Sequence, residues 1–418
     1  MVKQVVVTGM GCITSIGNNV ADFTTALQEG RSGAGNIQRP DLLKFLSGFD
    51  VQIACEVRNP PLDRFFDTRE LKRLDPSSQF AIMAAEEARQ NAGLTDWNGD
   101  PYRAAVILGA DIGGVRTYEE QLLKMTEKGP SKVSTFTIPK LMPNALAANL
   151  SSRFGYHGDS FTVNKACSSA TGAMGVAFRA VQRGEYDFVI TGGSSAATTS
   201  LAIAGFSNMK ALTSAYNDNP KGASRPFDLN RSGFVIGEGA GILVFEELEH
   251  AKARSVPIIA EVIGYGVSCD AQDIVQPCET GEYAARALVN ALNDARISPE
   301  QVDYINAHGT ATPLGDIAET RAIKRAFGQH AYRIPISSTK SMHGHALGAA
   351  GGIEVIAAIG AIRDGVIPPT INLENPDPEC DLNYTPNQAI ERPVNVAISE
   401  NFGFGGHNDV LLVREWKE

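Results

Sequence analysis

The sequence consists of two similar halves, and this internal duplication is the feature that most limits the possible folds. Residues 153–187 resemble residues 326–365: each segment contains Phe-Gly, an extended run, a loop of small and reactive residues, a helix rich in small residues and a closing Gly. The halves also begin alike, in VVVTGMGCIT and AEVIGYGVSC, and end alike, in GILVFEELE and DVLLVREWKE. No short repeat period is present, so the pattern indicates one duplication and not a solenoid. We place the boundary near residues 251–257, which divides the chain into residues 1–253 and 254–418.

Helical and extended segments alternate within each half. The helical pattern at residues 79–94 precedes the strand-like run 103–110, and the second half repeats this order at 282–297 and 302–310. This alternation predicts an α/β fold with mostly parallel sheets covered by helices on both faces. The two Gly/Ala-rich helices that follow the reactive loops are expected to form a shared central layer. Reactive groups gather at the carboxyl ends of strands in such sheets, so the two loops are expected to face one site.

The reactive loop of the first half contains a thiol at the start of a helix. A strand-like run leads to Cys167, and small residues follow it in FTVNKACSSATGAMG (161–175). The positive end of a helix dipole favours thiolate over thiol, which predicts a nucleophile near neutral pH. A buried cysteine that acts only as a small apolar residue is the alternative. This segment alone does not decide between the two interpretations.

Composition excludes several classes of protein. The net charge of −10 argues against general nucleic-acid binding, which needs a clustered positive surface. No apolar run reaches the roughly 18 residues that span a bilayer, and the N-terminus lacks the pattern of a signal peptide. The six cysteines are scattered without a CxxC pair, which predicts free thiols in a reducing compartment and a cytoplasmic protein.

Three loops of the second half contain further reactive residues. They are NAHGTATPLGD (306–316) with His308, Thr310 and Thr312; SSTKSMHGHALGAAGG (337–352) with Lys340, His343 and His345; and ENFGFGGHN (400–408) with Phe402 and Phe404. Taken singly, a histidine after a strand is more often structural than catalytic. No carboxylate cluster completes a ligand set around the HGH sequence, so no metal site is predicted. The opening VVVTGMGCITSIG lacks the GxGxxG spacing of dinucleotide-binding proteins.

Together these motifs resemble the β-ketoacyl-acyl carrier protein synthases, the decarboxylating condensing enzymes of fatty-acid and polyketide synthesis. The resemblance covers essentially the whole chain and is strongest to the elongating synthase II type. Its most specific segments are ACSS at Cys167, the three loops above, and RPFDLNRSGFVIGEGAG (225–241). It implies a thiolase-like αβαβα layered fold of two similar halves, the first with the nucleophilic cysteine and the second with two catalytic histidines.

The resemblance also implies a role for each matching residue. Cys167 would receive an acyl chain from acyl carrier protein as a thioester, and malonyl-carrier protein would condense with it to give β-ketoacyl-carrier protein in fatty-acid elongation. His308 and His345 would assist decarboxylation and stabilise the enolate. The backbone N–H groups of Cys167 and Phe404 would form the oxyanion hole. Lys340, paired with Glu319, would order the histidine loops. The implied substrate-binding residues are Thr310, Thr312, Ile112, Thr137, Phe402 and Phe404.

The partner implied by the resemblance is the acidic, helical carrier protein. Arg69, Lys72 and Arg73 are spaced i, i+3 and i+4, which places them on one helix face for docking, and Lys210 is expected to join them. An ordinary solvated face is the alternative. The synthase itself is expected to bind no cofactor, because phosphopantetheine on the carrier protein carries the substrates. A homodimer is expected, a heterodimer with a ketosynthase-like chain-length factor is the alternative, and neither nucleic acid nor membrane is an expected partner.

Some residues depart from the pattern of the family. Lys165 stands where a small or neutral residue is usual, and we expect its side chain to be exposed to solvent. His343 stands where synthase II sequences usually have Thr, and Thr137 where they tend to have Phe, whereas Ile112 matches.

Three other functions remain as alternatives. The first is the ketosynthase subunit of a type II polyketide or polyene pathway, paired with a chain-length factor. A non-condensing ketosynthase-like partner usually lacks the cysteine and often one histidine, which are present here. A CoA-dependent thiolase would need a second reactive cysteine near FGFGGHN, and that segment has none.

Overall fold

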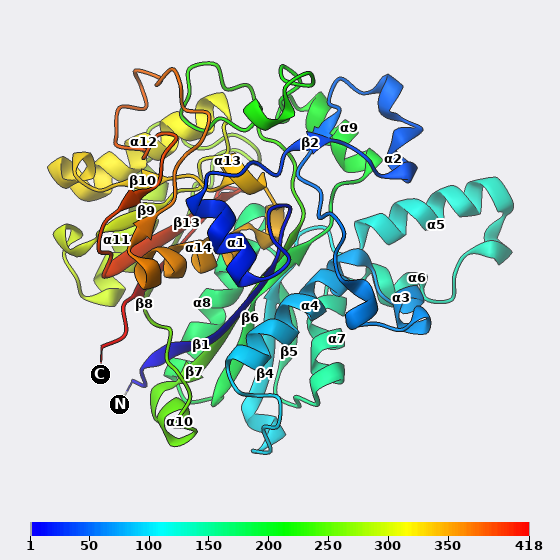
Figure 1. Cartoon of the computed structure of the whole chain (residues 1–418), viewed down its shortest axis with the longest axis horizontal. Coiled ribbons are helices and arrows are strands. Elements are labelled where there is room, and N and C mark those ends of the chain that lie inside the picture. The colour runs from blue at the N-terminus through cyan, green and yellow to red at the C-terminus, as the bar shows by residue number, and fades with distance from the viewer. Residues whose placement is uncertain (1, 418) are drawn as a thin grey trace.

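The computed structural model describes residues 2–417, and its main element is one ten-stranded sheet with the order β10-β9-β13-β14-β8-β1-β7-β6-β4-β5 (Figure 1). The strands of the first half are β1 (Val5–Ile13), β4 (Ala104–Gly109), β5 (Ser160–Val163), β6 (Phe188–Ser195) and β7 (Gly239–Glu247). Those of the second half are β8 (Ala260–Cys269), β9 (Tyr304–Asn306), β10 (Ile336–Ser337), β13 (Val396–Gly403) and β14 (His407–Arg414). Two short hairpin-like pairs lie apart from it: β2 (Gly35–Asn36) with β3 (Ile53–Ala54), and β11 (Val366–Ile367) with β12 (Ile390–Glu391).

The strand order repeats the duplication that the sequence predicts. Read outward from the centre, the first half runs β1-β7-β6-β4-β5 and the second half runs β8-β14-β13-β9-β10. The two halves join through an antiparallel pairing of β1 with β8, in which Val6 lies opposite Glu261. Each half is therefore one five-stranded unit, and the two units share a single hydrogen-bonded sheet.

The expectation of mostly parallel sheets was wrong. In each half the two outer pairings are parallel, as in β4 with β5, and the two inner pairings are antiparallel, as in β6 with β7. The physical reason is that β6 to β7 and β13 to β14 are not joined by a covering crossover helix. The β13 to β14 connection is a tight turn, which only an antiparallel pair permits.

Helices form three layers around the two halves of the sheet. The helices are α1 (Val20–Gln28), α2 (Pro40–Leu43), α3 (Thr68–Arg73), α4 (Pro76–Asn91), α5 (Val115–Lys128), α6 (Thr137–Leu141), α7 (Ala145–Phe154), α8 (Ser169–Gln182), α9 (Ser200–Asn208), α10 (Leu248–Ala253), α11 (Glu282–Ala295), α12 (Pro313–Phe327), α13 (Lys340–His343) and α14 (Ala350–Asp364). One core joins α4 and α7 to the first half of the sheet, and another joins α11 and α12 to the second. The third core lies between the two halves. These layers are the αβαβα arrangement that the family resemblance implies.

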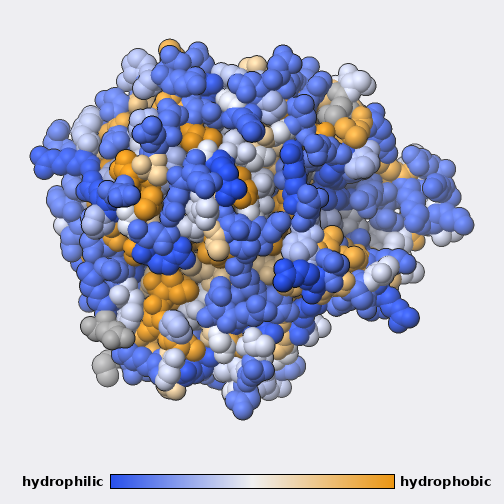
Figure 2. All heavy atoms as spheres, viewed as in Figure 1, coloured by the Kyte–Doolittle hydropathy of each residue, from blue (hydrophilic) through white to orange (hydrophobic). Residues whose placement is uncertain are grey.

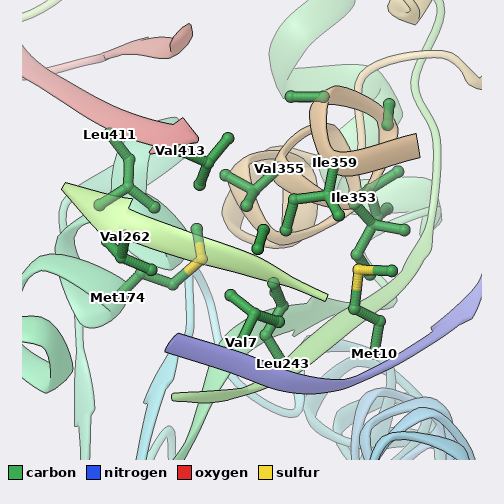
Figure 3. Close-up of a cluster of buried hydrophobic side chains, with 14 of the residues drawn as sticks. Val7, Met10, Met174, Leu243, Val262, Ile353, Val355, Ile359, Leu411 and Val413 are labelled. Carbon is green, nitrogen blue, oxygen red and sulfur yellow. The ribbon is translucent and has the colours of Figure 1, made fainter. Parts of the chain in front are cut away.

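The central layer consists of α8 and α14, the two small-residue helices expected there. Every residue of α14 from Ala350 to Ile362 is buried. Figure 3 shows Met174 of α8 and Ile353, Val355 and Ile359 of α14 facing side chains of β1, β7, β8 and β14. Gly241 shows how tight this packing is, because a Cβ there would lie 2.3 Å from the backbone of α14. Small residues are therefore required for the central helices to approach the strands.

The surface differs from this apolar interior. Figure 2 shows a face that is mostly hydrophilic, with hydrophobic residues in separate patches. In Figure 1, α5 projects from the body, and its exposed residues include Tyr118, Leu122 and Met125. Among residues 2–417, no helix combines the length and hydrophobicity that crossing a bilayer requires.

Candidate active site

A cavity of about 400 Å³ collects the reactive residues of both halves. Cys167 lines it from the first half, and His308 and His345 line it from the second. Thr310, Thr312, Phe402, Phe404 and Glu319 are also part of its lining, as is the exposed Lys210. The prediction that the Cys167 loop and its matching loop face one site is confirmed.

The turn before Cys167 has an unusual backbone. β5 ends at Val163, and Ala166 then has φ of 50°, in the left-handed region that costs a non-glycine residue energy. A short 3-10 turn (Ala166–Ser168) follows and leads into α8. The hydroxyl of Ser169 stabilises this turn, because it accepts from the Lys165 N–H at 2.9 Å and donates to the Ala166 carbonyl at 2.7 Å. Cys167 is thereby held at the entrance of the central helix.

Burial dominates the electrostatics of the nucleophile candidate. It raises the pKa of the Cys167 thiol to about 12, while a hydrogen bond from the Phe404 N–H and the charge of Lys340 act in the opposite direction. Burial thus opposes the thiolate that the helix terminus is expected to favour, and the state of the thiol near neutral pH stays a prediction. The N–H groups of Phe404 and of Cys167 itself both approach the sulfur. These two N–H groups are the ones expected to form an oxyanion hole.

The two histidines of the cavity lie close together and are held neutral. Their ring centroids are 5.4 Å apart and the rings are nearly perpendicular, at 89°. Burial lowers the pKa of both His308 and His345 well below the usual value, and the charge of Lys340 lowers each of them further. A neutral imidazole has one N–H donor and one acceptor nitrogen, so both residues can stabilise a developing oxyanion or accept a proton.

Lys340 pairs with Glu354 and not with Glu319, which corrects the expected pairing. Both side chains are almost completely buried, Lys340 on α13 and Glu354 in the middle of α14. Asn401 donates to the other oxygen of the Glu354 carboxylate at 2.6 Å. The ammonium group, whose charge acts on both histidines, is therefore fixed by an ion pair from the central helix.

Glu319 supports the His308 loop through the backbone. Its two carboxylate oxygens accept from the N–H groups of His308 at 2.6 Å and Gly309 at 2.7 Å. The second carboxyl of this region is Glu400, whose pKa burial and the neighbouring Glu319 raise well above its usual value. With Glu400 neutral, the charged Glu319 beside it meets no second buried negative charge, so the two carboxyl groups do not repel each other.

The remaining predicted substrate residues divide into two groups. Thr310 and Thr312 contact each other, with 3.1 Å between their hydroxyl oxygens, and Phe402 packs against His308 at 5.7 Å between ring centroids. Ile112 and Thr137 do not line the cavity of this chain. Ile112 is 49% exposed and Thr137 begins α6, beside the projecting α5. Their assignment to the substrate remains a prediction.

The predicted docking residues are exposed cations. Arg69, Lys72 and Arg73 lie on α3, which a capping box of Asp67 and Glu70 begins. Within residues 2–417 no carboxylate forms an ion pair with any of the three, although the Arg73 guanidinium lies 5.2 Å from the ring centroid of Phe136.

Lys165 is only partly exposed to solvent, with 29% of its side chain accessible, and its charged end is paired inside the protein, which we did not expect. Its ammonium nitrogen lies 2.7 Å from a carboxylate oxygen of Asp409, which is completely buried. The other unusual residue, His343, is buried and is not part of the cavity lining. Its Nε2 contacts the Thr339 hydroxyl at 3.0 Å, and burial lowers its pKa to about 3.

Comparison with known proteins decides the family. Residues 2–251 match the model of the β-ketoacyl synthase N-terminal domain, and residues 259–374 match that of the β-ketoacyl synthase C-terminal domain. The chain belongs to the β-ketoacyl synthase family.

Within this family the curated relatives include synthases of the second type. The chain is 46% identical over 417 residues to 3-oxoacyl-[acyl-carrier-protein] synthase 2 of Synechocystis sp., with 99% of each chain covered. It is 43% identical over 415 residues to the enzyme of that name in Staphylococcus aureus strain N315, again with 99% of each covered. The chain is thus a β-ketoacyl synthase of the synthase II type.

Solved β-ketoacyl synthase structures have the same fold. The ketosynthase of a type II polyketide synthase, in complex with its acyl carrier protein, is 34% identical with a TM-score of 0.92 and 100% coverage of both chains. A β-ketoacyl synthase of Burkholderia phymatum is 34% identical with a TM-score of 0.91, covering 99% of this chain and 100% of that one.

Sequence reasoning missed four acidic residues next to the site of this synthase, three of them buried and one, Asp111, partly buried. They are Glu354, Glu400, Asp409 and Asp111, whose carboxylate accepts from the Ser195 hydroxyl at 2.6 Å and the Gly348 N–H at 3.2 Å. A signal for Glu354 was available, because it is the one charged residue in the apolar stretch 347–362. Asp409 directly precedes the apolar run VLLV of β14. A charged residue in or next to an apolar segment is expected to be buried and therefore needs a partner of opposite charge. The place where the two meet indicates the position of the site.

Proposed function

We propose that this chain catalyses the decarboxylative condensation of an acyl-carrier-protein thioester with malonyl-carrier protein, in fatty-acid elongation. The observation that carries the proposal is the meeting of three groups in one cavity: a cysteine whose sulfur faces two backbone N–H groups, and two neutral histidines. Acyl transfer through a covalent intermediate needs a nucleophile and an oxyanion hole, and decarboxylation needs donors that stabilise an enolate.

Acyl transfer is the first half of the proposed reaction. The Cys167 sulfur forms a bond to the thioester carbon, and the phosphopantetheine sulfur of the carrier protein leaves and receives the thiol proton. The N–H groups of Cys167 and Phe404 stabilise the negative oxygen of the tetrahedral intermediate. Because the thiol is protonated at neutral pH, its proton must move during the attack. The neutral imidazoles in the same cavity are able to accept and return it.

Condensation is the second half. The bond between the malonyl carboxylate and the adjacent carbon breaks, carbon dioxide leaves, and His308 and His345 donate to the enolate oxygen of the thioester. The enolate carbon then attacks the Cys167 thioester, and the sulfur leaves and regains a proton. Burial, reinforced by the charge of Lys340, keeps both histidines neutral, which preserves the donor and acceptor nitrogens that these steps need.

Acyl carrier protein is the partner that we propose for the surface around α3. An unpaired group of exposed cations attracts an acidic protein, and Lys210 extends positive charge to the cavity lining. Thr310 and Thr312 offer hydroxyl groups inside the cavity for the amides of the pantetheine arm. No bound cofactor is needed, since the carrier protein brings both substrates. The six cysteines are free thiols, which supports the proposed location in the reducing cytoplasm.

A second ketosynthase-type chain is the other proposed partner. Strand β5 ends the sheet, so one of its edges is unpaired within the described chain, and an exposed edge favours pairing with another strand. Exposed apolar residues such as Ile112, which follows the neighbouring strand β4, and Ile138 of α6 also support an interface. We propose a homodimer, with Ile112 and Thr137 lining the acyl pocket from the interface. A heterodimer with a chain-length factor is the alternative, and one solved neighbour is described as a ketosynthase/chain length factor.

The test is condensation by the purified chain with acyl-carrier-protein primers of graded length and unsaturation, with malonyl-carrier protein as extender. Product formation by the chain alone supports fatty-acid elongation by a homodimer. Activity only after co-expression with a chain-length factor would assign the chain to a type II polyketide or polyene pathway. Intact mass of Cys167→Ala provides the matched control, because acyl-enzyme in that variant would contradict the assigned nucleophile.

A further inference from the structure

We propose that Lys165 is a positioning residue, whose ion pair with Asp409 holds the Cys167 turn against the Phe404 turn. This bridge sets the distance between the two backbone N–H groups that receive the thioester oxygen. The inference rests on the proposed condensation and adds a residue pair that the reaction scheme does not use.

The ion pair is part of a cluster of three side chains that joins the two halves of the molecule. The Lys165 ammonium nitrogen is 2.7 Å from Asp409 Oδ1 and 3.5 Å from the hydroxyl of Tyr265. The Tyr265 hydroxyl donates to the same Asp409 oxygen. Lys165 comes from the first half, whereas Tyr265 is on β8 and Asp409 on β14 of the second half. A completely buried carboxylate thus receives two neighbouring donors on the same oxygen.

Each end of the bridge is connected to one of the two N–H groups. The Lys165 carbonyl accepts from the Ser168 N–H at 3.1 Å and the Ser168 hydroxyl at 3.0 Å, which closes the turn around Cys167. Asp409 lies opposite Asn401 in the pairing of β13 with β14, the hairpin whose turn contains Phe404. The ion pair therefore links the backbone of one donor to the backbone of the other.

The central helix provides space for this cluster. A Cβ at Gly172 would lie 2.9 Å from Cδ of Lys165, and a Cβ at Gly175 would lie 2.1 Å from the ring of Tyr265. A rigid ring cannot move out of such an overlap without losing its contact with Asp409. The glycines of α8 thus accommodate the two side chains that hold the carboxylate.

The role of Lys165 is geometric and not electrostatic. The charges that shift the pKa of the Cys167 thiol are those of Lys340 and Asp111, and the ammonium group of Lys165 is engaged with Asp409. The backbone contact is close, since a Cβ at Gly403 would lie 2.5 Å from the Lys165 carbonyl and 3.2 Å from the Cys167 nitrogen. A displacement of about 1 Å between reacting groups can lower a rate about 100-fold.

The test compares Lys165→Met and Asp409→Asn with a matched control, Arg179→Met. Arg179 also forms an ion pair between the halves, 2.8 Å from Asp294 with a side chain 35% exposed, and it contacts the Tyr265 carbonyl. It does not contact the Cys167 turn. We expect Lys165→Met and Asp409→Asn to lower kcat about 10- to 100-fold while KM changes less than about twofold, because only the oxyanion contact is disturbed. Arg179→Met should retain the wild-type kcat.

A spectroscopic measurement separates positioning from general stability. The acyl-enzyme is prepared with a ¹³C-labelled thioester carbonyl, whose infrared band moves to higher wavenumber when hydrogen bonds to the oxygen are lost. We expect this shift in Lys165→Met and Asp409→Asn and none in Arg179→Met. An unchanged band and kcat in the first two variants, with only a lower melting temperature, would overturn the proposal.

Two further variants keep the test decisive. If Lys165→Met does not fold, the same measurements on Asp409→Asn, which has nearly the same shape as the wild-type residue, decide the outcome. Lys165→Arg should restore most of the kcat, because it keeps the charge, and loss of activity equal to that of Lys165→Met would also contradict the proposal. Wild-type protein that forms no acyl-enzyme would instead refute the proposed function, so the two failures are distinguishable.

Discussion

Ala166 and Leu347 have the same backbone conformation, with φ of 50° and 46°, at matching positions of the two halves. Each residue begins a short 3-10 turn that leads into a central helix, α8 or α14. A left-handed conformation costs a residue with a side chain roughly 1–2 kcal/mol, so it persists only where the surrounding structure imposes it. The two halves therefore share even this one strained backbone angle. In the first half the strained residue lies directly before Cys167.

The high pKa of the thiol predicts how Cys167 reacts with an alkylating reagent. The rate of modification by iodoacetamide should continue to rise with pH to about pH 10, because thiolate is the reactive form and burial raises the pKa to about 12. The rate is measured by intact mass and corrected with Cys167→Ala, since Cys269 is exposed. A plateau below pH 8 would show that thiolate forms near neutral pH.

His308→Ala should lower the release of labelled carbon dioxide from malonyl-carrier protein by about 100-fold or more, because one of the two enolate donors is lost. His343→Thr is the matched control, since His343 is buried nearby but does not line the cavity. It should release carbon dioxide at close to the wild-type rate. Unchanged release by His308→Ala would remove that residue from the mechanism.

Breaking the Lys340–Glu354 pair should destabilise the protein strongly. Removal of one partner of a buried ion pair typically costs about 3–5 kcal/mol, because the other charge is left without compensation. Lys340→Met and Glu354→Gln should each lower the free energy of unfolding, as measured with urea. The double variant Lys340→Met/Glu354→Gln should lose less than the sum of the two single changes. Simple additivity would show that the two groups do not interact.

Charge reversal on α3 should weaken the use of carrier protein. Arg69→Glu/Lys72→Glu should raise KM for acyl-carrier protein about 10-fold at low ionic strength, with little change in kcat, because exposed charges act mainly on encounter. Lys252→Glu on α10 is the control, as that helix contributes nothing to the cavity lining. A fall in kcat alone would assign the α3 cations a role other than docking.

The three buried histidines should each lower stability as the pH drops below about 6.5, whereas buried carboxyl groups with raised pKa, such as Asp316 and Glu400, act in the opposite direction. In the folded state burial holds the pKa of His308, His343 and His345 below the usual value, so below about pH 6.5 the unfolded chain binds more protons than the folded protein. Each group then contributes a loss of up to about 1.4 kcal/mol per pH unit. Urea unfolding between pH 7.5 and 5.5 measures the slope. His343→Thr should reduce the slope by the share of one group.

The sequence predicted the duplicated fold, the central helices and the convergence of Cys167, His308 and His345, because repeated patterns and loop positions depend on local chemistry. It did not predict the mixed strand directions, which depend on how β7 and β14 return to the sheet. It also misassigned the partner of Lys340 and the direction of Lys165. The two errors have different causes. Glu354 lies in the same half as Lys340 and reaches it through the fold of α13 against α14, whereas Asp409 is distant in sequence from Lys165 and meets it only because the two halves pack together. The raised pKa of Cys167 likewise depends on burial, which a motif does not contain.

Gly348 occupies the position in the second half that Cys167 occupies in the first, and Asp111 fills the space beside it. A Cβ at Gly348 would lie 2.8 Å from the Asp111 nitrogen, so no larger residue can be accommodated there without movement. A twofold-repeated architecture could hold two thiols, each reacting with its own substrate. In this protein the matching loop of the second half has no thiol and forms part of the cavity around Cys167. Each polypeptide can therefore hold one acyl chain at a time. Mass spectrometry should therefore detect a stoichiometry of one acyl group for every subunit.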